Sequence, residues 1–141
     1  STTMVDLKTK EIDRLILSAT TARDQAYAPH SHFYVGAALL MNDSAVVIGC
    51  NVENASYSMC LCAERVAASS AIAAGYREWR ALAIASVGGV APCGACRQFL
   101  AEFGLNLPII TTYVIDGSYK IRNLSHLFPE AFDRSSLPHH A

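Results

Sequence analysis

The chain has 141 residues and a mass of 15.2 kDa, a length that favours one compact domain over residues 1–141. Its net charge of −1 is spread without long runs of either sign, which argues against nucleic-acid binding, since that usually requires a basic patch. The longest apolar run, residues 81–96, is broken by glycines and a proline and falls short of the roughly 20 residues of a membrane span.

The first half of the chain predicts a helix followed by a hairpin. Apolar side chains recur at helical spacing over residues 6–27, and Asp6 is the expected N-cap. The Ala-Pro-His-Ser stretch at residues 28–31 ends this helix. Two strands are then expected over residues 34–41 and 45–51, joined by an Asn-Asp-Ser turn at residues 42–44.

The second half predicts a loop over residues 52–61, followed by alternating helices and strands. A helix over residues 62–75 is built mostly of small side chains, which let backbones approach closely, so it is expected in a crowded centre. After it come a buried strand, a short helix, a hairpin around Asp116-Gly117 and a tail with one short helix, over residues 81–87, 94–103, 108–114, 119–122 and 124–141. The order α-β-β-α-β-α-β-β predicts an α/β fold in which one sheet lies between helices.

The bulk composition predicts subunit association and a role for cysteine chemistry. Hydrophobic residues make up 52% of the chain and the mean hydropathy is +0.24, so apolar surface in excess of one small core is expected to lie in an oligomer interface. Five cysteines fit a disulfide framework poorly. Because no secretory signal is recognised, a reducing cytoplasmic setting is expected, in which clustered cysteines more often bind metal.

Two cysteine clusters stand where a loop enters an expected helix. Cys62 begins one helix, and Cys93 and Cys96 lie three residues apart in the first turn of the other. The partial positive charge of a helix N-terminus favours the thiolate that zinc requires. Three protein ligands and an open position are typical of catalytic zinc, whereas structural zinc usually has four ligands. Glu64, two residues beyond Cys62, is close enough to act as a base at such an open position.

Two questions follow from a site built on three thiolates. Their charge makes a bound water less acidic, so it needs an offset, for which the helix termini, Arg65 and Arg97 are the candidates. The second question is the ligand count, because Cys60 can complete a closed four-cysteine structural site. In that alternative Glu64 is an ordinary solvated carboxylate in the first turn of a helix.

Four motifs, in this order, resemble the small homotetrameric cytidine deaminases whose zinc is held by three cysteines. They are SHFYVGAAL, GCNVENASY, CAER and PCGACRQ, at residues 31–39, 49–57, 62–65 and 92–98. The match runs over residues 27–103 and more weakly to about residue 132. The resemblance implies a three-layer α-β-α sandwich with a mixed five-stranded sheet, and one Zn²⁺ per subunit. It also implies a cytoplasmic enzyme of pyrimidine salvage that hydrolyses cytidine and 2′-deoxycytidine to uridine and 2′-deoxyuridine.

The same resemblance assigns roles to individual residues. The zinc ligands it implies are Cys62, Cys93 and Cys96, with Cys60 at a position that is not a ligand. Glu64 matches the group that moves protons, and Arg65 matches a residue that hydrogen-bonds the ligand thiolates. The implied substrate contacts are Asn51 and Glu53 to the ribose 3′-hydroxyl, Phe33 to the pyrimidine ring, and Ala55, Tyr57 and Phe132 across shared subunit boundaries.

The sequence departs from the family pattern at three places. His30 stands where the family more usually has tyrosine, residues 86–91 form a shortened loop with two glycines, and the ending around Phe132 matches loosely. Three alternatives to a cytidine deaminase remain: a deaminase of the same fold with another cytosine-type substrate, a zinc-stabilised interaction module without catalysis, and an enzyme that edits polynucleotides.

Overall fold

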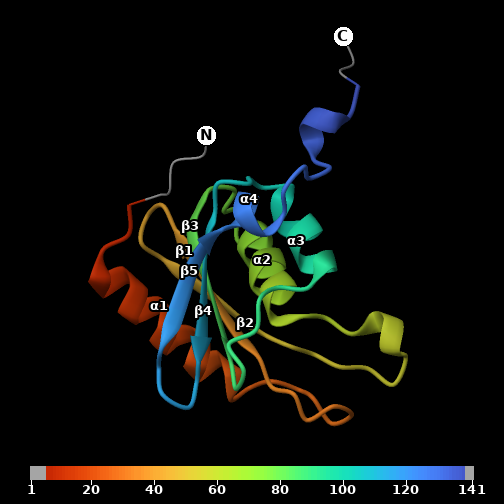
Figure 1. The fold of residues 1–141 in the computed structure, drawn as a ribbon. Coiled ribbons are helices and arrows are strands. Elements are labelled where there is room, and N and C mark those ends of the chain that lie inside the picture. Colours follow the sequence, from red (N-terminus) through yellow and green to blue (C-terminus); the bar gives the residue numbers. More distant parts are fainter. Residues whose placement is uncertain (1–5, 139–141) are drawn as a thin grey trace.

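The computed structural model describes residues 6–138, which form three layers (Figure 1). The central sheet has the strand order β2-β1-β3-β4-β5, and its strands are Gly36–Met41 (β1), Val46–Cys50 (β2), Trp79–Ser86 (β3), Pro108–Tyr113 (β4) and Tyr119–Asn123 (β5). Strands β3 and β4 are parallel and the other neighbouring pairs are antiparallel. The predicted mixed five-stranded sheet is therefore confirmed.

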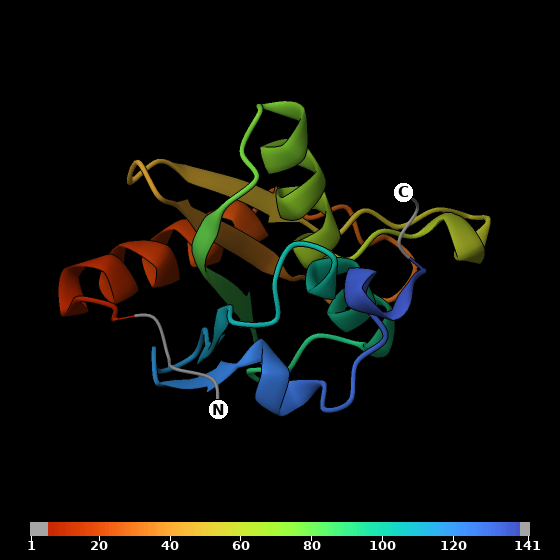
Figure 2. The same cartoon turned by 90° about the horizontal axis from the view of Figure 1, so that it is seen from above.

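Helices cover both faces of this sheet, as the views in Figures 1 and 2 show. One face carries α1 (Thr9–Arg23), and the other carries α2 (Ala63–Ala73), α3 (Gly94–Ala101) and the short α4 (Leu124–Leu127). Short 3-10 turns lie at Tyr57–Met59 (η1) and Arg134–Ser136 (η2). The predicted α-β-α sandwich is confirmed. Within residues 6–138, no helix combines the length and apolar character that crossing a membrane requires.

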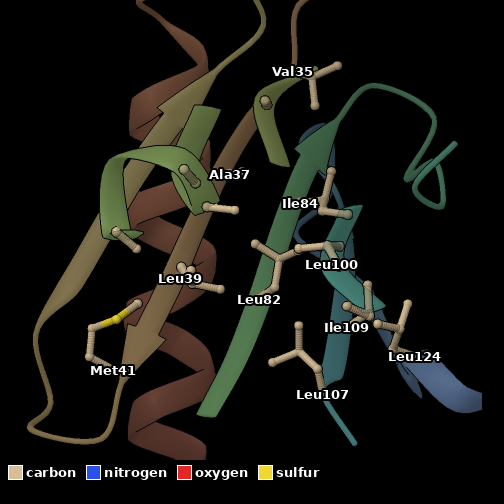
Figure 3. Packing of buried hydrophobic residues seen from close by; sticks show 14 residues of the cluster. Val35, Ala37, Leu39, Met41, Leu82, Ile84, Leu100, Leu107, Ile109 and Leu124 are labelled. Atoms are coloured by element: carbon tan, nitrogen blue, oxygen red, sulfur yellow. The ribbon is translucent and has the colours of Figure 1, made fainter. Parts of the chain in front are cut away.

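The sheet is apolar on both sides because both sides are covered, so β1 is buried at every position. Alternate residues of β1 enter different cores. Ala37, Leu39 and Met41 pack under α2 and α3 (Figure 3), whereas Ala38 and Leu40 pack under α1. The continuous apolar run of the sequence is thus divided between two hydrophobic layers.

Helix α2 lies very close to the sheet, as its small side chains predict. Its buried face is made of alanines with no exposed surface, namely Ala63, Ala67, Ala68 and Ala71. Opposite them Gly49 of β2 has no side chain, and a Cβ there would lie 2.4 Å from the Ala67 nitrogen and 2.6 Å from the Ala63 oxygen. The close contact fixes the position of α2 and hence of the residues at its N-terminus.

We expect Gly49→Ala to lower the free energy of unfolding by about 2–3 kcal/mol, because overpacking that pushes on backbone cannot be relieved by a side-chain rotation. Denaturant unfolding followed by circular dichroism measures the change. Gly88→Ala is the matched control, since a Cβ there meets nothing closer than a Val90 methyl at 3.7 Å. Equal unfolding midpoints for the two variants would contradict a tight contact between α2 and β2.

The first helix is shorter than predicted at both ends. It starts at Thr9 with Lys8 as N-cap, because the Glu11 carboxylate accepts the Lys8 backbone N–H at 3.0 Å; the prediction of Asp6 as the cap is wrong. It ends at Arg23 rather than at residue 27. Tyr27 is instead drawn into a bridge with Val52, through backbone hydrogen bonds of 3.0 and 2.8 Å to residues 51 and 53.

Most other boundaries shift by one to three residues from those predicted. Strand β1 begins at Gly36 rather than at residue 34, because the backbone of Phe33 and Val35 is hydrogen-bonded by the side chain of Asn51. The tail contains the predicted short helix, α4, and additionally η2, which the Asp133 side chain caps by accepting the Ser135 N–H. Residues 139–141 lie outside the described part of the chain.

Candidate active site

Three thiols from two helix starts gather at one point. Cys62 is the N-cap of α2, Cys93 is the N-cap of α3, and Cys96 lies in the first turn of α3. Neither N-cap side chain caps the backbone of its own helix, so both thiols are available to a shared partner. The three sulfurs lie within 4.8 Å of one another, and the Cys62 and Cys93 sulfurs are 3.8 Å apart. The structure thus brings together the predicted ligand set.

The spacing and chemistry of these thiols fit zinc. A Zn–S bond is about 2.3 Å, so two thiolates on a tetrahedral zinc lie roughly 3.8 Å apart. Cys60 is outside the cluster: its sulfur accepts the Asn54 N–H at 3.3 Å and faces the Asn54 carbonyl at 3.7 Å. Among residues 6–138 the metal-type cluster therefore has three members, which leaves a tetrahedral ion one open position. The closed four-cysteine alternative does not agree with this geometry.

The surroundings of Cys62 favour its thiolate. A hydrogen bond from the Cys96 thiol, followed by one from Arg65, lowers the pKa of Cys62 to about 5. The same hydrogen bond, together with burial, raises the pKa of Cys96. Arg65 Nη2 lies 3.6 Å from the Cys62 sulfur, where its charge offsets that of the thiolate. Arg97 does not share this role, because it donates to the carbonyls of Pro92 and Leu127.

Glu64 is the buried carboxyl group beside the thiols. It occupies the first turn of α2 and is only 4% exposed. Burial is the main cause that raises its pKa, and the negative charge of Cys62 acts in the same direction. Raising the pKa of a carboxyl group brings it closer to neutral pH, which favours a role as a general acid-base group.

A cavity of about 230 Å³ opens beside Glu64 and the thiols. It is lined by Phe33, Val35, Asn51, Glu53, Cys60, Leu61, Cys62, Ala63, Glu64, Val90, Ala91 and Cys93. Drug-sized ligands typically occupy about 300–1,000 Å³, so this space suits a smaller molecule. A larger hollow of about 720 Å³ lies between the end of α3 and residues 133–135, but it contains no thiol and is not beside Glu64.

Hydrogen bonds hold the polar wall of this cavity. The Asn51 amide donates to the Phe33 carbonyl at 2.7 Å and accepts the Val35 N–H at 2.9 Å. The Glu53 carboxylate accepts the backbone N–H groups of His30 and Ser31 at 2.9 and 3.0 Å. Hydrogen bonding by Ser31, led by its hydroxyl, is the main cause that lowers the pKa of Glu53, so this carboxylate is held in its ionised form.

Residues 9–112 match the family model described as the cytidine and deoxycytidylate deaminase zinc-binding region. The chain belongs to this deaminase family. A cytidine deaminase of Sporosarcina psychrophila is 42% identical over 134 residues, which are 93% of this chain and 98% of that protein. The crystal structure of a Burkholderia pseudomallei cytidine deaminase is 50% identical, with a TM-score of 0.82 over 85% of this chain and 98% of that chain. The crystal structure of the cytidine deaminase of Mycobacterium tuberculosis is 40% identical, with a TM-score of 0.77 over 90% of this chain and 98% of that chain.

Membership in the deaminase family agrees with the geometry of the thiol cluster, and zinc is the cofactor that both indicate. The structure places Phe33, Asn51 and Glu53 on the cavity wall, next to Glu64. Ala55, Tyr57 and Phe132 do not line it. The loop that carries Tyr57 reaches away from the body in both views (Figures 1 and 2), and the Tyr57 side chain is 75% exposed.

Phe132 is held at the surface by α3, the helix that carries Cys96. Gln98, two residues after Cys96, donates to the Phe132 carbonyl at 2.7 Å, while the Phe132 side chain remains 59% exposed. The contacts of Phe132, Ala55 and Tyr57 with substrate across a subunit boundary stay predictions.

Sequence reasoning missed part of the cavity wall. Val90 and Ala91 line it because the shortened loop folds back: the Ser86 hydroxyl accepts the Val90 N–H at 3.0 Å, and Gly89 has a positive φ of 58° against the ring of Tyr113. The double glycine was the visible signal of a tight turn, but it did not reveal which side chains the turn presents. Ser31 lies inside the first of the four motifs, but no role for it follows from the sequence.

Proposed function

We propose that this protein is a zinc-dependent hydrolase that deaminates cytidine and 2′-deoxycytidine to uridine and 2′-deoxyuridine. The observation that carries the proposal is a buried carboxyl group, Glu64, beside an open cluster of three thiols at the wall of a small cavity. The relatives named cytidine deaminase, at 42–50% identity over most of the chain, support the same reaction. An interaction module without catalysis has no need of a buried acid at an open ligand position.

Cys62, Cys93 and Cys96 would hold the metal, which when bound supplies a Lewis acid that makes a water molecule nucleophilic near neutral pH. Glu64 would take a proton from the attacking water and deliver it to ring nitrogen 3 as the water oxygen bonds to carbon 4. It would then take the remaining proton of that oxygen and pass it to the amino group, so that the bond from carbon 4 to the amino nitrogen breaks, ammonia leaves and the carbonyl of uridine forms. Arg65 limits the negative charge that three thiolates place on the site.

The cavity favours a neutral nucleoside over a nucleotide. Its described lining contains no lysine or arginine that could bind a phosphate, and it carries the Glu53 carboxylate, which the turn at residues 30–31 holds ionised. Asn51 and Glu53 are the groups proposed to bind the ribose 3′-hydroxyl, a pairing that discriminates strongly because a substrate without that hydroxyl leaves buried polar groups unpaired. Phe33 is proposed to pack on the pyrimidine ring, since stacking of bases on aromatic side chains is worth about 1–3 kcal/mol.

The decisive experiment is the change in ultraviolet absorbance as cytidine becomes uridine, measured on protein whose zinc content per chain is known. We expect turnover of cytidine and 2′-deoxycytidine with one zinc per chain, and at most weak turnover of cytosine and cytidine 5′-monophosphate. A protein that holds zinc but turns over only the nucleotide would establish the alternative of a same-fold deaminase with another substrate.

We further propose that the chain forms one domain over residues 1–141, acts in the cytoplasm and assembles into a homotetramer with shared active sites. The described cysteines are all free, as is usual in reducing compartments. The apolar residues Tyr57, Met59 and Phe132 are each more than half exposed, and an oligomer interface would bury them. Native mass spectrometry should then find four times the 15.2 kDa chain mass.

Shared sites predict complementation between two defective variants. Glu64→Gln lacks the acid in its own chain, and Phe132→Ala lacks the aromatic ring that it would lend to a neighbour. Co-expressed as differently tagged chains, the two should regain activity well above either alone, because mixed oligomers contain intact sites. Leu137→Ala, which removes another exposed apolar side chain of the tail, is the control and should keep parent activity. No recovery on mixing would contradict a contribution of Phe132 across subunits.

A further inference from the structure

One hydroxyl group connects two residues of the cavity wall. The Ser31 Oγ donates to Glu53 Oε2 and accepts the Phe33 backbone N–H at 3.0 Å. The Ser31 backbone N–H donates to Glu53 Oε1 at 3.0 Å. Ser31 itself does not line the cavity, whereas Glu53 and Phe33 both do. Ser31 therefore contacts the two residues that face a ligand, Glu53 and Phe33, without facing the ligand itself.

Hydrogen bonds from the turn at residues 30–31 occupy most of the acceptor positions of the Glu53 carboxylate. An ionised carboxylate has about four acceptor positions. Oε1 takes the N–H groups of His30 and Ser31, and Oε2 takes the Ser31 hydroxyl. One acceptor position then remains, on Oε2, which matches a ligand that offers one hydroxyl hydrogen. Because hydrogen bonds to ionised groups are the stronger kind, the turn fixes the direction in which that last position points.

The ring-bearing residue of the wall is fixed by the same turn. The Phe33 peptide is held at its nitrogen by Ser31 Oγ and at its carbonyl by Asn51. His32, which lies between Ser31 and Phe33 in the chain, has a positive φ of 55°, and its N–H donates to the Ala28 carbonyl at 2.9 Å. A non-glycine residue in this conformation persists only where surrounding contacts hold it. Ser31 supplies the contact that joins this strained turn to Glu53.

We propose that Ser31 is a positioning residue that directs the Glu53 carboxylate at the sugar hydroxyl, while Asn51 continues to hold the Phe33 carbonyl. The inference rests on the proposed function, because it concerns the same cavity. Removing the hydroxyl leaves Glu53 with two open acceptor positions on Oε2 and frees the Phe33 N–H, so the carboxylate loses its single direction. Binding of a nucleoside with a 3′-hydroxyl should weaken, while the thiol cluster and Glu64 remain unchanged.

The test compares Ser31→Ala with the parent on cytidine and on 3′-deoxycytidine. For cytidine we expect KM to rise roughly tenfold, the effect of losing one hydrogen bond to a charged group, with kcat within about twofold. For 3′-deoxycytidine the same substitution should change KM less than about twofold, because the hydroxyl that Glu53 binds is already absent. Ser31→Thr keeps the hydroxyl and should restore the parent KM. Ser69→Ala, an exposed serine of α2, is the matched control and should leave both constants unchanged.

Each other outcome overturns the proposal. An equal rise of KM on both substrates, a fall in kcat alone, or no change shows that Ser31 does not act through Glu53. Zinc content and the unfolding midpoint are measured on every variant, and if Ser31→Ala folds poorly, Ser31→Cys makes the same comparison with a weak donor of similar size. A parent enzyme that turns over cytidine, together with an unaffected Ser31→Ala, refutes only the role of Ser31. A parent that does not act on cytidine refutes both proposals.

Discussion

Replacing Glu64 by glutamine should lower kcat for cytidine by at least about 10²–10⁴-fold, the usual contribution of positioned proton transfer. Glutamine has nearly the same shape and keeps hydrogen-bonding capacity, but it cannot take up a proton. Glu64 is buried, and burial raises its pKa. Among the described residues of the cavity wall the other carboxyl group is Glu53, whose pKa is lowered by the turn at residues 30–31. Glu53 is held ionised and therefore cannot replace Glu64 in proton transfer. Steady-state kinetics on cytidine measure the loss.

The variant must keep its metal for this result to bear on the mechanism. We expect one zinc per chain in Glu64→Gln, because Glu64 is not one of the three clustered thiols and its replacement is neutral. Glu102→Gln is the matched control, because that side chain is exposed and, among residues 6–138, forms one ion pair, a 3.8 Å contact with Arg134. The activity of this variant should equal that of the parent. A zinc-loaded Glu64→Gln enzyme with parent activity would refute proton transfer by Glu64.

The chemistry of the site could be read from local sequence because its geometry is local. Cys93 and Cys96 are one helical turn apart, and Cys62 and Glu64 are the cap and second residue of a helix, so spacing alone fixes their relation. The meeting of the two helix starts is a long-range event, but it follows from the α-β-α order, since both helices pack on the same face of the sheet. What spacing left open was the ligand count, and the Cys60 thiol decides it by bonding Asn54.

The hydrogen bonds that hold Asn51 and Glu53 could not be predicted from local sequence, because they join segments that are distant in the chain. The carboxylate of Glu53 is held from residues 30–31, and the carboxamide of Asn51 is held by residues 33 and 35. The same long-range pairing shortens the first helix, because Tyr27 bridges Val52. Helical periodicity continues through Tyr27, so no local pattern marks that end.

Asn51 illustrates how the structure changes the weight of a predicted contact. The resemblance assigns its side chain to the ribose 3′-hydroxyl, yet the carboxamide already binds the Phe33 carbonyl and the Val35 N–H, and the residue is 9% exposed. One N–H and one lone pair remain for a ligand. Asn51 therefore combines a structural role, which the geometry shows, with a binding role that stays a prediction.

A single pair of cysteine variants separates the two zinc sites that the sequence allows. Cys93→Ser should reduce bound zinc to less than roughly a tenth of one per chain, because serine replaces a thiolate with a weak hydroxyl ligand and leaves two thiols. Cys60→Ser should keep one zinc per chain and parent activity, since serine can continue to bond Asn54. The two positions are matched, as each loses one sulfur atom from the same cavity wall.

Thermal unfolding gives the same comparison an energy scale. Metal that binds only the folded chain stabilises it by about 4 kcal/mol when free zinc exceeds the dissociation constant 1,000-fold. Zinc added after chelation should therefore raise the unfolding midpoint of the parent and of Cys60→Ser, but not that of Cys93→Ser. Cys93 is exposed, so its substitution costs little packing and the lost response reports the metal. If Cys60→Ser also lost its zinc response, the site would be a closed four-cysteine centre, and the open position on which the proposed reaction depends would not exist.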